Sequence, residues 1–464
     1  MRSAGSRIEM KPTAHFPLPE AFLQRMQQQL GSAYTSFLSS IEETAPVGVR
    51  LHPLKLASHY EFDLNHKIAW EDHGYYLEER IKFTFDPSFH GGAYYVQEPS
   101  SMLIGPVVKN LLEGLDQPVV LDLCASPGGK STSILSALGG RGLMVANEAI
   151  AGRVNGLQHN IIKWGYSNAL ISQADPSQFH SFPDLFDLIL VDAPCSGEGL
   201  FRKDQSSRKE WTPGLAHQCS LRQKRILTDI LPALKPGGIL VYSTCTFNPA
   251  ENMEQLSMLA GMGFESIPLP EWDQFPMVRL EENGIIGYQV YPHLMLGEGF
   301  FAGALRKVTG RHGAIPKTGS TGIEWVKAPG ESERFFSASS GLECFNHRDT
   351  YFVFPSGMAG ILDQFVGRLR IVQAGTALGQ LKNKDFVPAH AWAQSLDRPE
   401  TVTTLRLEKA EAIQYLRKNP IYIPGLDPGY GLIQYEGISL GWIKSVPGRI
   451  NNLYPITYRI IQAD

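Results

Sequence analysis

Two short motifs each carry a cysteine, and each motif ends an apolar, strand-like run. Cys195 lies in DAPCSG (residues 192–197), and Cys245 lies in STCT (residues 243–246). If the two runs are adjacent strands of a parallel sheet, their backbones lie about 4.8 Å apart and both thiols meet Asp192 at one edge. A single buried cysteine is more often an inert packing residue, but two thiols at matching strand ends beside a carboxylate favour catalysis.

Two thiols and a carboxylate suit substitution at carbon 5 of cytosine. That carbon is a poor nucleophile in the resting ring, and addition of a thiolate to carbon 6 makes it enamine-like. A carboxylate such as Asp192 can hydrogen-bond or protonate the nitrogen at position 3, which stabilises the adduct. A proton must then leave carbon 5 before the thiol is expelled, so the second cysteine has a role as base or as positioner of a base.

A glycine-containing loop precedes these motifs and predicts a cofactor site. DLCASPGGK (residues 122–130) follows an apolar strand and opens a helix, where Gly128 and Gly129 allow a tight turn and close approach of a ligand. Glu148 ends the second strand and can bind both hydroxyls of a ribose, while Asp175 ends the third and can accept from an exocyclic amine. We expect a nucleoside cofactor here; the alternative is a plain strand-to-helix turn with acidic helix caps.

The apolar runs around these residues predict an α/β fold with a mostly parallel, doubly wound sheet of seven strands. Five runs alternate with helical stretches, which is typical of a sheet covered by helices on both faces. They span residues 119–124, 143–148, 169–175, 186–194 and 238–245. Two later runs, at residues 264–269 and 299–308, are expected to close the sheet as a pair.

A small α+β module is expected ahead of this sheet. Pro19 opens a helix, and residues 46–97 form short, aromatic, strand-like segments. The buried face of the helix and of its continuation is predicted to consist of Phe22, Met26, Leu30, Phe37 and Ile41.

Composition excludes several classes of protein. With 464 residues, 43% hydrophobic and 19% charged, the chain is a globular protein of more than one domain. Its five scattered cysteines form no C-x-x-C pair, so neither a disulfide framework nor a metal site is expected. Without a long apolar run or a leader, we expect a cytoplasmic protein. The net charge of −4 requires that any nucleic acid be bound by local patches.

The three motifs at residues 122–130, 192–204 and 243–252, in this order and spacing, resemble those of the Sun (Fmu) family of RNA 5-methylcytosine methyltransferases, which use S-adenosylmethionine. The resemblance implies that Cys245 is the nucleophile and that Cys195 helps to release the methylated product. It also implies a set of cofactor contacts formed by Cys124, Ala125, Ser126, Pro127, Gly128, Gly129, Lys130, Glu148, Asp175 and Asp192.

The resemblance extends beyond the core to the bacterial 16S ribosomal RNA enzymes of the RsmF type. Residues 369–391 and 441–455 are similar to their C-terminal extension, which ends in a PUA-like RNA-binding fold. The implied partner is structured RNA, either 16S ribosomal RNA or the small ribosomal subunit, bound by a monomer. The expected parts are an N-terminal RNA-binding module (1–105), a catalytic domain (106–308), a linker (309–322), an extension (323–390) and a PUA-like domain (391–464).

Three alternatives remain at this point. A DNA cytosine methyltransferase places its nucleophile in the proline-cysteine motif of the fourth strand, and the second cysteine on the fifth strand argues against it. A transfer RNA could replace ribosomal RNA as substrate, or the protein could be a non-catalytic ribosome-assembly factor.

A basic loop follows Cys195 and contains Arg202, Lys203, Arg208 and Lys209. These residues either hold the RNA backbone or belong to a solvated loop.

Overall fold

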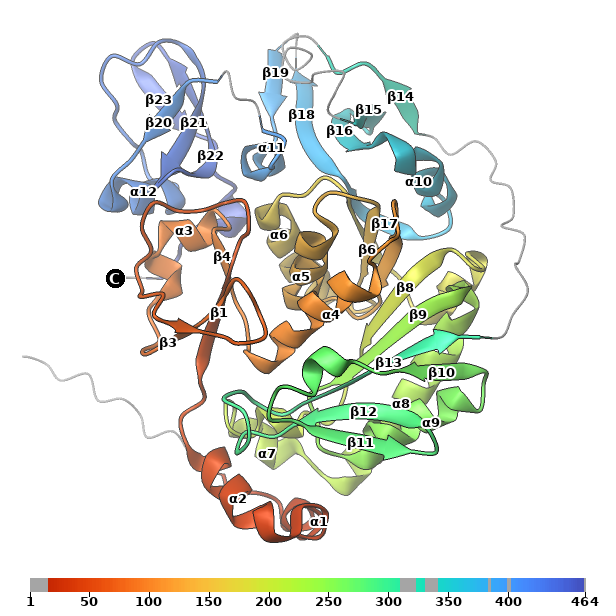
Figure 1. The fold of residues 1–464 in the computed structure, drawn as a ribbon. Helices are drawn as coiled ribbons and strands as arrows, with labels where there is room; N and C mark the ends of the chain where they lie inside the picture. The colour runs from red at the N-terminus through yellow and green to blue at the C-terminus, as the bar shows by residue number, and fades with distance from the viewer. Residues whose placement is uncertain (1–15, 309–322, 330–340, 383–384, 399–401, 463–464) are drawn as a thin grey trace, which may run out of the picture.

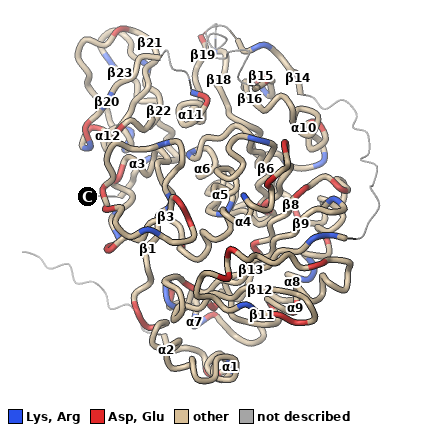
Figure 2. Tube along the Cα trace, viewed as in Figure 1, with Lys and Arg blue, Asp and Glu red and all other residues tan. Residues whose placement is uncertain are grey.

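The computed structural model describes residues 16–308, 323–329, 341–382, 385–398 and 402–462. The described chain forms four sheets, of which the largest lies at the centre of the molecule (Figure 1). Lys and Arg residues are interspersed with Asp and Glu along the chain (Figure 2), as the small net charge requires. The predicted linker at 309–322 lies outside the described residues. Among those that are described, no helix is both long and apolar enough to cross a membrane.

The N-terminal module consists of two helices and a small antiparallel sheet with strand order β2-β3-β1-β4. Its elements are α1 (Glu20–Leu30), α2 (Tyr34–Glu42), β1 (Val47–Leu51), β2 (His66–Lys67), β3 (Gly74–Leu77), α3 (Pro87–His90) and β4 (Tyr94–Val96). Four of the five predicted helix residues are fully buried, while Leu30 is half-buried. Phe22 and Phe37 pack against Phe201 and Phe247, which belong to the loops that follow the two cysteines.

The five predicted apolar runs form the parallel centre of the main sheet, as expected. They are β5 (Val119–Asp122), β6 (Leu143–Asn147), β7 (Ala169–Gln173), β8 (Phe186–Asp192) and β9 (Leu234–Thr244). Their order in space is β9-β8-β5-β6-β7, so the chain changes direction across the sheet at β5. In such sheets ligands bind at the carboxyl ends of the strands, near the point of reversal.

The main sheet has ten strands rather than the predicted seven, because antiparallel strands extend it at both edges. The predicted closing pair is present, and a hairpin of two further strands joins it at one edge. These strands are β10 (Phe264–Ile267), β11 (Val278–Glu282), β12 (Ile285–Val290) and β13 (Phe300–Lys307). At the other edge, β17 (Arg370–Ala374), which belongs to the predicted extension, pairs with β7.

Helices cover both faces of this sheet. Neighbouring strand residues point to opposite faces, so Val120 packs with one helical layer and Leu121 with the other. The first layer contains α4 (Ile104–Leu111), α5 (Gly129–Leu138) and α6 (Ala151–Trp164). The second contains α8 (Pro213–Ile230), α9 (Met253–Ala260) and α10 (Ala359–Phe365), while α7 (Ser206–Glu210) lies in the loop after Cys195. This architecture confirms the predicted fold class.

Two smaller sheets form the C-terminal part. The first contains β14 (Glu324–Val326), β15 (Leu342–His347), β16 (Thr350–Pro355), β18 (Thr376–Lys382) and β19 (Asp385–Pro388), and α11 (His390–Gln394) follows it. The second contains β20 (Thr404–Arg406), β21 (Gly429–Tyr435), β22 (Ile438–Val446) and β23 (Arg449–Asn452), with α12 (Lys409–Leu416). This last domain lies beside the N-terminal module (Figure 1), and Lys409 pairs with Glu61 at 2.7 Å. The N-terminal module and the last domain therefore contact each other.

Candidate active site

The two sequence-predicted cysteines meet at the carboxyl ends of β8 and β9. These strands are parallel neighbours with Asp192 opposite Ser243, so the loops that follow them leave the sheet together. The Sγ atoms of Cys195 and Cys245 are 3.2 Å apart, within hydrogen-bond distance for two sulfurs. Cys245 lines a cavity of 320 Å³, whereas Cys195 does not belong to the lining of that cavity. The arrangement places one thiol in reach of a ligand and the other in reach of that thiol.

The electrostatics of the pair separate the two sulfurs. The hydrogen bond to Cys245, together with burial and the charge of Cys245, raises the pKa of Cys195 well above its ordinary value. Cys195 therefore keeps its proton at neutral pH and can donate it toward Cys245. Because Cys245 lines the cavity and Cys195 does not, Cys245 is the sulfur positioned to attack a ligand as the nucleophile.

Asp192 is held in the same cavity by two partners. Lys130 Nζ lies 2.7 Å from one carboxylate oxygen, and Ser243 Oγ donates to the other at 2.8 Å. Burial alone would lower the pKa of Lys130, but the charge of Asp192 and the hydrogen bond to it outweigh burial and raise that pKa. The result is a fixed acid–cation pair that lines the same cavity as Cys245.

A buried glutamate joins the two cysteine loops, and sequence reasoning assigned it no role. Glu251, in the loop after β9, accepts from the backbone N of Ser196 at 2.8 Å and from Ser196 Oγ at 2.5 Å. Gln223 Nε2 of α8 donates to the same carboxylate at 3.1 Å. Because Ser196 directly follows Cys195, these bonds set the position of one thiol relative to the other.

A second buried glutamate makes the reciprocal connection. Glu198, in the loop after β8, accepts from the backbone N of Phe247 in the loop after β9 at 3.1 Å. It also accepts from Trp211 Nε1 at 3.0 Å and pairs with Arg25 of α1 at 2.6 Å. Both glutamates lie within the motifs that carry the cysteines. The sequence signal that could have pointed to them is an acidic residue a few positions after each cysteine. Their buried positions became visible only in the folded chain.

The predicted cofactor loop has the geometry of a ligand cradle. Gly128 has a φ of 112°, which side chains other than hydrogen rarely permit, and α5 begins at the next residue. The loop runs beneath the 320 Å³ cavity, and six of its seven predicted contacts line that cavity: Cys124, Ala125, Ser126, Pro127, Gly129 and Lys130.

Two buried carboxylates at this edge retain free acceptor atoms that suit a nucleoside cofactor. Asp122 Oδ1 and Glu148 Oε2 are buried and have no hydrogen-bond partner among the described residues. Arg153 lies 3.6 Å from the Glu148 oxygen, while Ser131 Oγ donates to the other oxygen of Asp122 at 2.6 Å. Burial raises the pKa of Asp122 to about 7. Acceptors of this kind fit ribose hydroxyls and an ammonium group, so these residues fit the expected cofactor.

Asp175, like Gly128 and Glu148, is a predicted contact that lies outside the cavity lining. Its carboxylate accepts from the backbone N of Ser177 at 3.1 Å and pairs with Arg225 at 3.1 Å, and it does not line the cavity. It therefore acts as a helix cap in the structure, which was the alternative reading of the sequence. Its contact with an exocyclic amine remains a prediction.

The basic loop after Cys195 differs from both sequence interpretations. Arg202 and Arg208 are buried and bind the N-terminal helices: Arg202 Nη2 donates to Thr44 O at 2.7 Å, and Arg208 pairs with Glu42 at 2.9 Å. These two arginines hold the end of α2 and the segment that follows it against the active-site loops. Of the loop's lysines, Lys203 is exposed and lines the cavity.

A doubly wound sheet with a glycine turn, buried acids at its edge and a thiol pair defines the class of S-adenosylmethionine-dependent methyltransferases. Comparisons with known proteins indicate the same class and narrow it to one family. A family model described as 16S rRNA methyltransferase RsmB/F matches residues 109–306. Models for the N-terminal domain and the PUA domain of 16S rRNA methyltransferase RsmF match residues 18–99 and 402–460.

Curated relatives cover nearly the whole chain. Ribosomal RNA small subunit methyltransferase F of Escherichia coli O6:H1 is 31% identical over 96% of each chain, and that of Erwinia tasmaniensis is 30% identical over 96% of this chain and 98% of its own. The chain therefore belongs to the RsmF family. It is an RNA methyltransferase, and its cofactor is S-adenosylmethionine.

Solved structures share the fold of 62–63% of the chain. NSun6 from Pyrococcus horikoshii with SFG matches with a TM-score of 0.53 and 19% identity, covering 63% of this chain and 99% of its own. A methyltransferase homolog protein from the same organism matches with a TM-score of 0.52 and 27% identity, covering 62% and 95%. Among the described residues, no cluster of His, Cys, Asp or Glu is arranged to hold a metal ion.

Proposed function

We propose that this protein methylates carbon 5 of a cytosine in 16S ribosomal RNA through a covalent bond between Cys245 and carbon 6 of the base. The observation that carries the proposal is the thiol pair at 3.2 Å, with only Cys245 lining the cavity. The named relatives act on the small-subunit ribosomal RNA, which supports this RNA as substrate. S-adenosylmethionine supplies an electrophilic methyl group beside the base.

In the first step, the Cys245 thiolate adds to carbon 6 of the cytosine. The electron pair of the ring double bond moves toward carbon 5 and the ring nitrogen at position 3, which takes up a proton. Asp192 can pass this proton on from Lys130, whose ammonium nitrogen lies 2.7 Å from the carboxylate, and Lys130 is left neutral. Carbon 5 is then enamine-like and can accept the methyl group.

In the second step, the product is released. Once Cys245 is a thioether, it has no charge, so one of the causes that raised the pKa of Cys195 is removed. Cys195 can then lose its proton to solvent and accept the proton from carbon 5. The electrons of that carbon–hydrogen bond restore the ring double bond, the carbon–sulfur bond breaks, and Cys245 leaves as a thiolate. Nitrogen 3 returns its proton through Asp192 to Lys130.

The test is incubation of the purified protein and tritiated S-adenosylmethionine with unmodified 16S ribosomal RNA, followed by bisulfite sequencing. We expect one or a few protected cytosines, and none with Cys245→Ala. The Cys245→Ala protein should still bind S-adenosylhomocysteine, because the thiol does not belong to the glycine loop or the acidic edge. A parallel incubation with transfer RNA tests the alternative substrate. Turnover by Cys245→Ala would reject the proposed nucleophile.

The cytoplasmic location and the monomeric state remain predictions. Gel filtration with light scattering of the purified protein measures the second directly. A molar mass near the 51.4 kDa of one chain is expected.

A further inference from the structure

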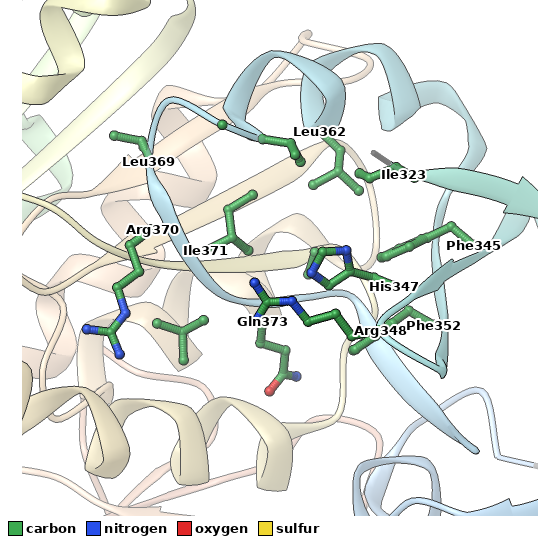
Figure 3. Close-up of a pocket in the computed structure, with 14 residues that line it drawn as sticks. Ile323, Phe345, His347, Arg348, Phe352, Leu362, Leu369, Arg370, Ile371 and Gln373 are labelled. Carbon is green, nitrogen blue, oxygen red and sulfur yellow. The ribbon is translucent and has the colours of Figure 1, made fainter. Parts of the chain in front are cut away.

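A second cavity lies far from the cysteines, between the main sheet and the C-terminal extension. Its volume is 560 Å³, which is within the range of sites for nucleotide-sized ligands. Its walls come from the β15–β16 hairpin, from α10 and the loop that follows it, and from β17 (Figure 3). None of the three matching family models covers this part of the chain.

One wall of the second cavity is aromatic and aliphatic. Phe345 and Phe352, opposite each other on β15 and β16, stack with ring centroids 5.1 Å apart and planes 11° apart. Leu362, Leu369 and Ile371 continue this wall. Planar apolar walls of this kind favour a planar ligand such as a nucleobase, because stacking is tolerant of which base is present.

Two arginines, Arg348 and Arg370, and His347 also line the cavity. Among the residues that the structure describes, no aspartate or glutamate lines it. Within the part of the chain that the structure describes, the Arg348 and Arg370 side chains form no hydrogen bond or ion pair. Arg25, Arg202 and Arg208, by contrast, all bind acidic groups or backbone oxygens. Unpaired guanidinium groups beside an apolar wall suit a phosphate with its base.

The cavity and the active site lie at the same edge of the main sheet. Arg370 of β17 is opposite Gln173, the last residue of β7, so it stands at the carboxyl edge where the cysteine loops also lie. Five strand spacings separate β17 from β9, which is about 24 Å along the sheet. One RNA molecule can therefore reach both places.

We propose that this cavity binds one unpaired nucleotide of the substrate RNA, with the base against the half-buried Phe352, which stacks on the buried Phe345, and the phosphate at Arg348, while Arg370 lies on the other side of Ile371 (Figure 3). The proposal rests on RNA as the substrate and concerns recognition outside the target cytosine. RNA proteins read single-stranded bases by stacking and hold the backbone with arginine. The nucleotide would hold the RNA at a second point while the cytosine occupies the 320 Å³ cavity.

The test compares the parent protein with Arg348→Gln, Arg370→Gln and the double variant. Both arginines are exposed, so their loss should not affect folding. The probe is a fluorescein-labelled, mixed-sequence single-stranded RNA of twelve nucleotides, with S-adenosylhomocysteine filling the cofactor site. We expect the double variant to bind at least tenfold more weakly, and the slope of log K against log salt to decrease by about 0.7, which is the contribution of one phosphate contact on a single strand.

A matched control and a second readout locate the site. Lys382→Gln removes one exposed cation from the sheet that contains β15 and β16 but does not line the cavity, so its affinity should match the parent. Photocrosslinking with 4-thiouridine in the RNA should label the peptide that contains Phe345 and Phe352. On 16S ribosomal RNA, KM should rise in the double variant while kcat is retained.

The outcomes distinguish this proposal from the proposed function. If the parent methylates 16S ribosomal RNA, but the double variant keeps the parent's affinity, salt slope and KM, the nucleotide site is rejected and the catalytic proposal stands. Crosslinks confined to other segments would also reject it. If the parent methylates no RNA cytosine, the proposed function fails, and the binding measurements still report on the cavity. If the protein bound adenosine monophosphate but not the RNA probe, the ligand of the cavity would be a free nucleotide, and the proposal would be overturned.

Discussion

Glu251 accepts a hydrogen bond from the backbone N of Ser196 at 2.8 Å, which ties the loop of one cysteine to the loop of the other. Glu198 makes the reverse connection to Phe247 at 3.1 Å. Each carboxylate is fully buried, and each satisfies a backbone donor of the opposite loop. Buried groups with these bonds resist displacement, because breaking one leaves an unpaired polar group away from water. The thiol pair is therefore held by a reciprocal clamp.

Replacement of Cys195 by alanine should trap the protein on RNA. The variant can still form the bond between Cys245 and carbon 6, but it lacks the group that we propose accepts the carbon 5 proton. A denaturing gel with radiolabelled RNA should show a slow-migrating complex, and Cys195→Ala/Cys245→Ala should abolish it. Cys219→Ala, on α8, is the matched control and should turn over normally. Full turnover without a complex in Cys195→Ala would assign the release step to another group.

Replacement of Glu251 by glutamine should loosen the clamp while preserving size. A glutamine can place its oxygen at the two N–H donors, Ser196 N and Gln223 Nε2, and its NH2 group at the Ser196 hydroxyl, but it loses the negative charge that strengthens these bonds. We therefore expect the free energy of unfolding to decrease by about 1 kcal/mol. The value of kcat should fall, and the Kd for S-adenosylhomocysteine should change little. Glu254→Gln, an exposed residue of α9, provides the control. If the two substitutions changed kcat equally, Glu251 would have no role in positioning the cysteine loops.

Replacement of Gly199 by alanine should displace Cys245 directly. A Cβ atom at Gly199 would lie 2.5 Å from Gly299 O and 2.9 Å from Cys245 O, both of which are backbone atoms with little freedom to move. Overpacking of this kind costs about 1–3 kcal/mol of stability. Thermal unfolding and methyl transfer measure both consequences. Gly214→Ala, where the new atom would meet nothing closer than 3.8 Å, should behave like the parent.

The stability of the cofactor-free protein should depend on Asp122 and pH. Burial raises the pKa of Asp122 to about 7, above the value of about 3.9 in an unfolded chain. Between these values the folded state binds the extra proton, so this group lowers stability as the pH rises from 4 to 7. Asp122→Asn, which can still accept from Ser131, should therefore gain in Tm over the parent as the pH rises, with the full gain reached above pH 7.

The matched control for this pH dependence is Asp116→Asn, because Asp116 is exposed. Its difference in Tm from the parent should stay constant across the same range. A constant difference for Asp122→Asn as well would show that Asp122 has an ordinary pKa in the folded protein.

Local patterns in the sequence were enough to predict the centre of the sheet and the meeting of the cysteines. A parallel sheet has a regular spacing, and its strands end at one edge, so two cysteines that follow adjacent strands must converge. The same reasoning placed the glycine loop and Asp192 at the cavity. Glu148 and Asp175 lie outside its lining, and their contacts with the cofactor stay predictions, although Asp175 caps its own helix and pairs with Arg225 in this structure.

The sequence by itself determined the order of strands along the chain, the pair of thiols and the loop for a nucleoside cofactor. Only the tertiary structure decided that Glu198 and Glu251 clamp the thiol loops, that Arg202 and Arg208 are buried, and that β17 joins the main sheet. The physical reason is the separation along the chain between the residues that interact. Strand and helix periodicity depends on neighbours in the chain, whereas the partner of a buried charge or an edge strand is chosen by packing between segments many residues apart.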